Sequence, residues 1–249
     1  MKAILGLLLL AITASAASPA LAQDKAEQGR ELLQQAIEAL GGEAFLNLES
    51  AKMEGRVYSF RRDQLTGLST FVAYTRYPDQ QREEYGKNKE TIVVYSGDQG
   101  WEIDIHGVKP ISEEEMKTHL ERESMSAFHI LRYRLGEPGI LLEYAGRDFL
   151  GAQAVDVVNF IDADNRVATF YLDRLTHLPA RVVWVRRDAK TRERIEEEEF
   201  LSNYFTGQGI TAPRHMMRQR YGRRIFEAFV QKVYYNLPLP DSLFVASEQ

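Results

Sequence analysis

The chain has 249 residues, no cysteine, and 31 Lys and Arg residues against 36 Asp and Glu, which gives a formal net charge of −5. The lack of cysteine excludes disulfides, thiol catalysis and lipidation of a cysteine. A mildly acidic chain with well-mixed charges also argues against general nucleic-acid binding.

The first stretch of the chain, residues 1–22, has the features of a secretory signal peptide. Lys2 supplies the positive start, residues 3–12 form an apolar core, and a small-x-small motif ends at Ala22. The apolar run is well short of the ~20 residues that a membrane-spanning helix needs. We therefore expect an exported, periplasmic protein that is cleaved after Ala22. Without a repeat or a low-complexity linker, residues 23–249 are expected to form one domain.

The first half of the remaining chain predicts one helix followed by strands. Residues 26–40 carry apolar side chains at helical spacing, and Gly41-Gly42 ends this amphipathic helix. The next segments alternate between apolar and polar residues, as strands with one buried face do. Strands are predicted at 51–60, 68–77, 80–85, 91–95 and 101–105.

A second helical region interrupts the strands after Pro110. Ser112 and Glu115 have the spacing of a capping box, and an apolar stripe follows as far as residue 135. We expect this inserted helix to cover one face of the sheet.

The chain then returns to alternating strands between residues 141 and 205. Turn-forming residues are expected to separate these strands, with Gly146 and Gly151 bracketing the first reversal and later turns at 162–165, 176–179 and 188–191. A last pair of strands is predicted at 210–220 and 223–236. So many consecutive antiparallel strands predict a mainly β protein whose sheet curls, with helices across its concave side.

Catalytic and metal-binding patterns are weak. The five histidines show no zinc-site spacing, and the chain has neither a G-x-S-x-G motif nor a glycine-rich loop between a strand and a helix. Glu196 to Glu199 should lie opposite Arg181, Arg186 and Arg187, so that cross-strand ion pairs explain them. We therefore predict that the protein is not an enzyme and needs no cofactor or metal.

The most directional charge pattern is a group of arginines around the last predicted hairpin. These could meet anionic lipid headgroups or an acidic protein surface; alternatively, they form a solvated hairpin tip paired with nearby glutamates. The residues are Arg214, Arg218, Arg220, Arg223 and Arg224.

Turns and strand ends along nearly the whole chain after residue 22 resemble those of the outer-membrane lipoprotein-sorting protein superfamily, in its LolA-like branch. They comprise Gly41-Gly42, Lys52-Met53-Glu54-Gly55, residues 154–162, Asp173 with Thr176-His177-Leu178-Pro179, Asn203-Tyr204, Gly209-Ile210, Pro213, residues 236–239 and Leu243-Phe244. The resemblance implies a strongly curved antiparallel half-barrel, covered on its concave side by helices, with a hydrophobic cavity for acyl chains. Because it lacks cysteine, the chain resembles the soluble carriers of this superfamily and not its lipid-anchored receptor.

Together these features lead us to expect a periplasmic carrier of lipid or lipoprotein acyl chains, which exchanges its cargo with a membrane-bound donor or acceptor protein and contacts membranes transiently. A lipid-sensing regulatory module that binds a protein partner through the arginines stays open as the alternative, and an enzyme on the same scaffold is the third. Residue Arg56 is the nearest candidate, by position, for the ligand-contacting arginine of the carriers. The other predicted ligand-binding residues are Met53, Val57, Val72, Tyr74, Trp101, Ile103, Ile105, Met116, Leu120, Phe128 and Leu131.

Overall fold

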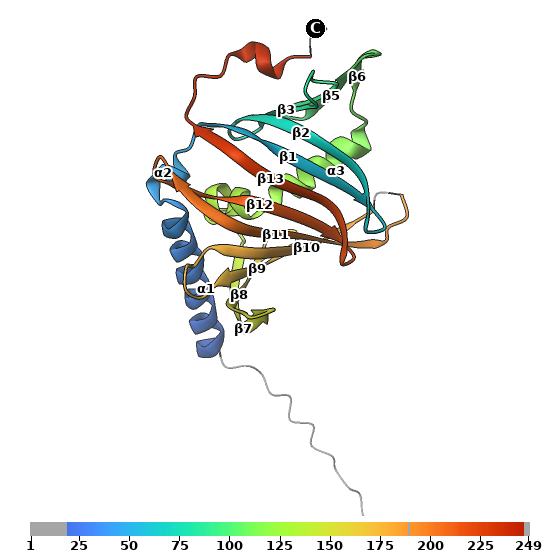
Figure 1. Cartoon of the computed structure of the whole chain (residues 1–249). Helices are drawn as coiled ribbons and strands as arrows, with labels where there is room; N and C mark the ends of the chain where they lie inside the picture. The colour runs from blue at the N-terminus through green and yellow to red at the C-terminus, as the bar shows by residue number, and fades with distance from the viewer. Residues whose placement is uncertain (1–18, 189, 247–249) are drawn as a thin grey trace, which may run out of the picture.

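In the computed structural model, which describes residues 19–188 and 190–246, thirteen strands form one antiparallel sheet (Figure 1). The predicted signal peptide therefore lies almost entirely outside the described residues. The strands are β1 (Ser50–Arg61), β2 (Gln64–Arg76), β3 (Gln80–Tyr85), β4 (Thr91–Ser96), β5 (Gln99–Asp104), β6 (Gly107–Pro110), β7 (Leu141–Leu150), β8 (Gln153–Ile161), β9 (Val167–Asp173), β10 (Pro179–Arg187), β11 (Arg194–Gly207), β12 (Ile210–Arg220) and β13 (Arg223–Tyr235).

The strand order is β6-β5-β4-β3-β2-β1-β13-β12-β11-β10-β9-β8-β7. The chain starts at the middle of the sheet, runs outward to β6, crosses to the opposite edge at β7, and returns to the middle. The first and last strands therefore pair with each other, with Ala51 opposite Tyr235 and Val57 opposite Ala228. The sheet is curved and not closed, which confirms the predicted half-barrel.

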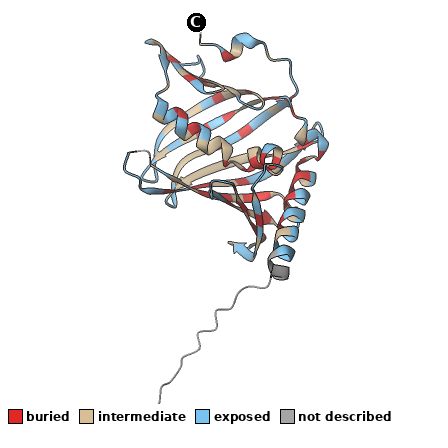
Figure 2. Cartoon of the chain, turned by 180° about the vertical axis from the view of Figure 1, so that it is seen from behind, coloured by how far each residue is buried: buried red, intermediate tan, exposed pale blue. Residues whose placement is uncertain are grey.

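The helical segments lie before the sheet, between β6 and β7, and after β13. They are α1 (Pro19–Leu40), α2 (Glu43–Leu46), α3 (Glu113–Ser124), α4 (Ala127–His129), the π-helical turn η1 (Ile130–Arg134) and the 3-10 turn η2 (Asp241–Phe244). Seen from behind, α3 crosses the concave face of the sheet (Figure 2). Among the described helices, none is long and apolar enough to cross a membrane.

The main core fills the half of the sheet between β7 and β11. The apolar stripe of α1, including Leu33, Ile37 and Leu40, packs there together with Ile130 and Leu131 of the inserted helical region. Phe160 and Phe170 of β8 and β9 are fully buried against them. This half of the concave face is therefore filled by side chains.

Two details differ from the sequence interpretation. The predicted inserted helix over 112–135 is divided, because a turn at Met125 and Ser126 separates α3 from α4 and η1; its capping box at Ser112 and Glu115 is confirmed. Gly146 does not bracket a reversal. It lies at an irregularity within β7, and the turn to β8 falls after Leu150.

The predicted ion pairs on β10 and β11 are confirmed in part. Arg181 pairs with Glu198, and the Nε of Arg186 lies 3.0 Å from the Oε1 of Glu197. These contacts bind adjacent strands to each other, so this acidic run is explained by the packing of the sheet.

Candidate ligand-binding cavity

An apolar strip runs along the concave face at the middle of the sheet. Alternation places Met53, Gly55 and Val57 of β1 on this face, next to Phe71 of β2 and Ala228 of β13. We define the concave strip by its buried cluster and by the side chains packed against that cluster. None of them comes from a helix, in contrast to the main core. The members are Val57, Phe71, Ala73, Ala228 and Val230, with Met53, Tyr85, Met216, Phe226 and Val233.

One end of the concave strip borders a large cavity of about 1040 Å³, to whose wall α3 contributes Arg122. Val57, Tyr85 and Phe226 of the strip line it, and Val93 and Tyr95 of β4 continue the wall. This volume can hold a flexible ligand, and the cavity lies on the half of the sheet that the main core leaves open.

Charged side chains also reach the large cavity. Arg218 of β12 and Arg122 of α3 line it, and the Arg218 guanidinium lies 4.3 Å from the ring centroid of Phe226. Burial lowers the pKa of Arg218, and the charge of Arg122 lowers it further. Glu83 accepts a hydrogen bond of 2.6 Å from the Tyr85 hydroxyl. The wide part of the space is therefore amphipathic rather than purely hydrophobic.

A smaller cavity of about 120 Å³ lies at the other end of the concave strip. Met53 and Met216 of the concave strip also line this smaller cavity. The remaining wall is mostly apolar and comes from α2, α4, η1, β1, β12, β13 and the segments before β1 and after β2. It consists of Phe45, Leu48, Ala51, Tyr77, Phe128, Arg132, Ile210, Thr211, Ala212, Pro213 and Tyr235.

The helix α3 is held on the sheet by few contacts. Only Met116 and His119 of α3 are buried. The His119 ring stacks on Tyr95 with a centroid distance of 3.6 Å, and its Nδ1 lies 2.9 Å from the Nη2 of Arg122. Because a guanidinium only donates hydrogen bonds, Nδ1 is the unprotonated acceptor. Burial lowers the pKa of His119 to about 4, which keeps the ring neutral near pH 7.

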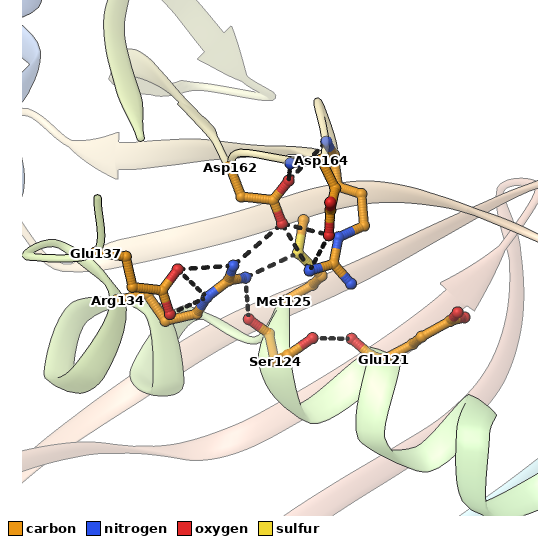
Figure 3. A network of polar contacts seen from close by, with 8 residues as sticks. Glu121, Ser124, Met125, Arg134, Glu137, Asp162 and Asp164 are labelled. Carbon is orange, nitrogen blue, oxygen red and sulfur yellow. Dashed lines mark hydrogen bonds and ion pairs between the residues drawn. The ribbon is translucent and has the colours of Figure 1, made fainter. Parts of the chain in front are cut away.

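By contrast, the segment after α3 is anchored firmly. The Arg134 guanidinium lies between two carboxylates, 3.0 Å from Glu137 and 3.1 Å from Asp162, and it also donates to the backbone oxygen of Ser124 (Figure 3). Asp162 in turn accepts from Arg166 at 2.8 Å. This network fastens the end of the inserted region to the turn between β8 and β9, so only α3 has the weak attachment of a lid.

The structure brings some of the predicted ligand-binding residues to these cavities. Met53 and Phe128 line the small cavity, and Val57 lines the large one. Arg56 belongs to the opposite set of β1 side chains, but it reaches the rim of the large cavity. Leu131 is buried in the main core and lines neither cavity.

Other predicted residues lie elsewhere, which corrects the expectation that all of them face the inserted helix. Val72 and Tyr74 alternate to the convex face of β2, and Trp101 and Ile103 pack on the same face against Ile92 and Val94. Ile105 is 87% exposed, Leu120 lies on the outer side of α3, and Met116 packs near Gly100. The physical reason is that the edge strands have a second apolar face, and the C-terminal turn η2 contacts the convex side of β3 and β4.

The arginines of the last hairpin do not share one surface. Arg218 lines the large cavity, Arg220 pairs with Glu197 at 3.0 Å, and Arg224 pairs with Glu227 at 2.9 Å. The guanidinium of Arg214 stacks over Phe205, while Arg223 is exposed beside the turn. The side chains are thus divided between an internal wall, cross-strand pairs and solvent.

A hydrogen-bonded set of polar side chains lies away from both cavities. Ser202, His215 and Glu227 are linked by hydrogen bonds of 2.8 and 2.7 Å across β11, β12 and β13, but these side chains lie outside both cavities. Within residues 19–188 and 190–246, no three His, Asp or Glu side chains gather as metal ligands would.

Sequence reasoning missed several residues of the small cavity, notably Arg132, Tyr77, Tyr235 and Met216. One signal was present for Arg132. It follows Phe128 by four positions, so both side chains lie on the same helical face, and an arginine there is surrounded by apolar neighbours.

The curved, open antiparallel sheet with helices across its concave face has the LolA-like fold. A DUF1329 family protein from Desulfovibrio piger is similar to this chain at 13% identity and a TM-score of 0.62, over 89% of this chain and 97% of the other. A putative outer membrane lipoprotein-sorting protein domain from Vibrio parahaemolyticus is 13% identical with a TM-score of 0.56, over 88% and 97%.

The LolA superfamily protein NE2245 from Nitrosomonas europaea is 10% identical with a TM-score of 0.55, over 87% of this chain and 97% of the other. Neither a family model nor a curated protein matches the sequence. At these identities the similarity shows a shared fold, and the function must be argued from the cavities.

Proposed function

We propose that this protein is a periplasmic carrier that shields an acyl chain of a lipid or lipoprotein between α3 and the concave face of the sheet. The observation that supports this most directly is the concave strip. Its apolar side chains extend from the large cavity to the small one, and no side chain from a helix belongs to this cluster. Burying about ten methylenes there contributes on the order of 8 kcal/mol before the costs of association.

The names of two proteins of similar fold support this proposal. They are named for lipoprotein sorting or the LolA superfamily, and a carrier needs only an apolar container and a cover that can move. Here α3 is the cover, because two buried side chains hold it, whereas α4 and η1 belong to the core. Loading and release would then involve a donor and an acceptor at the membranes.

Native mass spectrometry of the purified protein, combined with uptake of the neutral fluorescent dye N-phenyl-1-naphthylamine, tests the proposal. We expect bound lipid or saturable dye binding that added lipid displaces. Failure to find either, in protein shown to be folded, would contradict the carrier.

Two matched variants locate the binding space. Phe128 lines the small cavity and packs edge-to-face on Phe45 at 6.1 Å, whereas Leu120 is 42% exposed on the outer side of α3. We expect Phe128→Glu to abolish dye uptake and to destabilise the fold by about 3 kcal/mol or more. Leu120→Glu should keep the free energy of dye binding and the free energy of unfolding within about 0.5 kcal/mol of the wild-type values. Equal losses in the two variants would argue against this location.

A further inference from the structure

Arg132 places unpaired donors in the small cavity. Its Nη2 donates to the backbone oxygens of Leu46 and Leu48, but its Nε and Nη1 are buried without a hydrogen-bond partner. Among the described residues, no carboxylate oxygen lies within 4.0 Å of this guanidinium, although most other partly buried arginines of the chain have such a contact. The side chain is thus a cation without a counter-charge.

A second unpaired donor lies in the wall of the same cavity. The Tyr235 side chain is 6% exposed, and its hydroxyl is buried without a partner. Burial raises the pKa of Tyr235 to about 12, so the hydroxyl keeps its proton. Tyr235 closes the last strand opposite Ala51, which fixes the hydroxyl on a rigid element.

These unpaired donors destabilise the fold unless a ligand atom accepts hydrogen bonds from them. A buried donor left unpaired loses its hydration without gaining a hydrogen bond. The Tyr77 ring, 4.1 Å from the guanidinium carbon of Arg132, compensates the charge in part through a cation–π contact, but it accepts no hydrogen bond in the plane of the guanidinium. A carboxylate has two acceptor oxygens, so it can accept from one free nitrogen of Arg132 and from the Tyr235 hydroxyl at the same time.

The position of these donors also gives the orientation of a ligand. Met53 and Met216 belong to the concave strip and also line the small cavity, and methionine side chains adapt their shape readily. A chain that starts at Arg132 can therefore continue along the strip into the large cavity. An esterified acyl chain has no free carboxylate to offer at the inner end.

We propose that the cargo is a free long-chain fatty acid, whose carboxylate binds Arg132 and Tyr235 while its tail lies along the concave strip. This inference rests on the proposed carrier function and specifies its substrate class. It places the head group inside and the tail toward α3.

The experiment compares myristate with methyl myristate as competitors of N-phenyl-1-naphthylamine on the intact protein. The two share a chain, and only myristate carries the charged head. We expect myristate to bind at least about tenfold more tightly, as charge-assisted hydrogen bonds would give. If neither compound nor the dye binds, the carrier function itself fails. If both compounds bind equally well, the carrier stands and the carboxylate site is refuted.

Variants then assign the site. Arg132→Gln should remove the preference for myristate, so that the ratio between the affinities for myristate and methyl myristate falls to about one. Tyr235→Phe should weaken myristate about two- to fivefold without lowering the melting temperature, because the hydroxyl that it removes has no partner in the fold. This second variant keeps the test valid if Arg132→Gln is unstable.

Arg218→Gln is the matched control in the large cavity. It should leave the ratio between myristate and its ester unchanged. A ratio that falls in Arg218→Gln but not in Arg132→Gln or Tyr235→Phe would place the head group under α3 and overturn the inference.

Discussion

At the scale of single residues, the chain uses buried charges in two different ways. Arg134 is surrounded by acceptors, with Asp162 and Glu137 on either side. Arg132, two positions earlier, has two nitrogens without any partner. The paired arginine anchors the inserted region, and the unpaired one is available for a ligand.

The paired site leads to a stability prediction. The Asp162 side chain is 2% exposed, and Asp162→Asn removes the charge that two arginines share, which should lower the free energy of unfolding by about 3 kcal/mol. Asp164→Asn, at a carboxylate that is 80% exposed, should change it by less than about 0.5 kcal/mol. Urea unfolding at pH 7 measures both, and similar values for the two variants would contradict the role of Asp162.

The same aspartate should make stability depend on pH. Burial alone would raise the pKa of Asp162, but the backbone N–H of Arg166 and the Arg134 guanidinium lower it, and the net pKa lies below its ordinary value. The ionised carboxylate therefore stabilises the fold above the unfolded-state pKa of about 3.9, and this contribution is lost as the pH falls through the folded-state value. Asp162→Asn should flatten this part of the acid unfolding profile.

At the scale of secondary-structure elements, the two halves of the inserted region differ in attachment. α4 and η1 contribute Ala127, Ile130 and Leu131 to the main core, whereas α3 relies on Met116, His119 and a few polar contacts. One of these is an ion pair of 2.6 Å between Lys190 and Glu114 at an exposed site, which adds little. An element with so few buried contacts opens first.

The pKa of His119 predicts when α3 opens. This pKa is lowered to about 4, chiefly by burial; the charge of Glu123 opposes the shift, and the charges of Arg122 and Arg218 add to it. Because the folded-state pKa is below the unfolded value of about 6.5, the neutral ring stabilises the docked helix above pH 6.5, and this stabilisation is lost progressively as the pH falls toward 4. Acidification should therefore release α3 from the sheet.

Hydrogen exchange, corrected for intrinsic rates, can follow this opening. Between pH 7.5 and 4.5 we expect protection of the α3 amides to fall by up to about two orders of magnitude, while α4 and η1 stay protected. His119→Phe keeps an aromatic ring against Tyr95 but cannot take up a proton. The pH-dependent loss should be absent in this variant, and its persistence would assign the effect to another group.

At the scale of the whole molecule, the sheet depends on the pairing of its first and last strands. β1 and β13 meet at the middle of the sheet, and the register shifts between Glu54 and Gly55. A Cβ on Gly55 would lie 2.1 Å from the backbone oxygen of Phe229 and 2.9 Å from the Phe71 ring. Only glycine permits this close approach, which also shapes the floor of the concave strip.

Gly55→Ala should therefore disturb both stability and binding. We expect a loss of about 1–3 kcal/mol in the free energy of unfolding and weaker dye uptake, because the backbone of β13 must move. Gly67→Ala is the control on β2, where a Cβ would be no closer than 3.6 Å to its neighbours. Thermal unfolding and dye titration distinguish the two, and a neutral Gly55→Ala would show that the central pairing tolerates displacement.

Much of this architecture is determined by local sequence. Alternation and turn residues predict most strands, the capping box at Ser112 predicts where α3 begins, and opposite charges predict the pairing of Arg181 with Glu198. These features depend on residues close in the chain or on adjacent strands. The structure retains them because the two-residue period of a strand and the geometry of a helix end depend little on the surrounding fold.

Only the tertiary structure decides which side of each strand faces the cavity. Alternation places Val72 with Tyr74 on one face and Trp101 with Ile103 on one face, but it does not determine whether that face is concave or convex. The turn η2, with the buried Phe244, contacts β3 and β4 although it lies far along the chain. The small cavity is likewise assembled from α2, α4, η1 and the central strands β1, β12 and β13. Contacts between segments so distant in sequence arise from the order in which strands pair, and local patterns carry no information about that order.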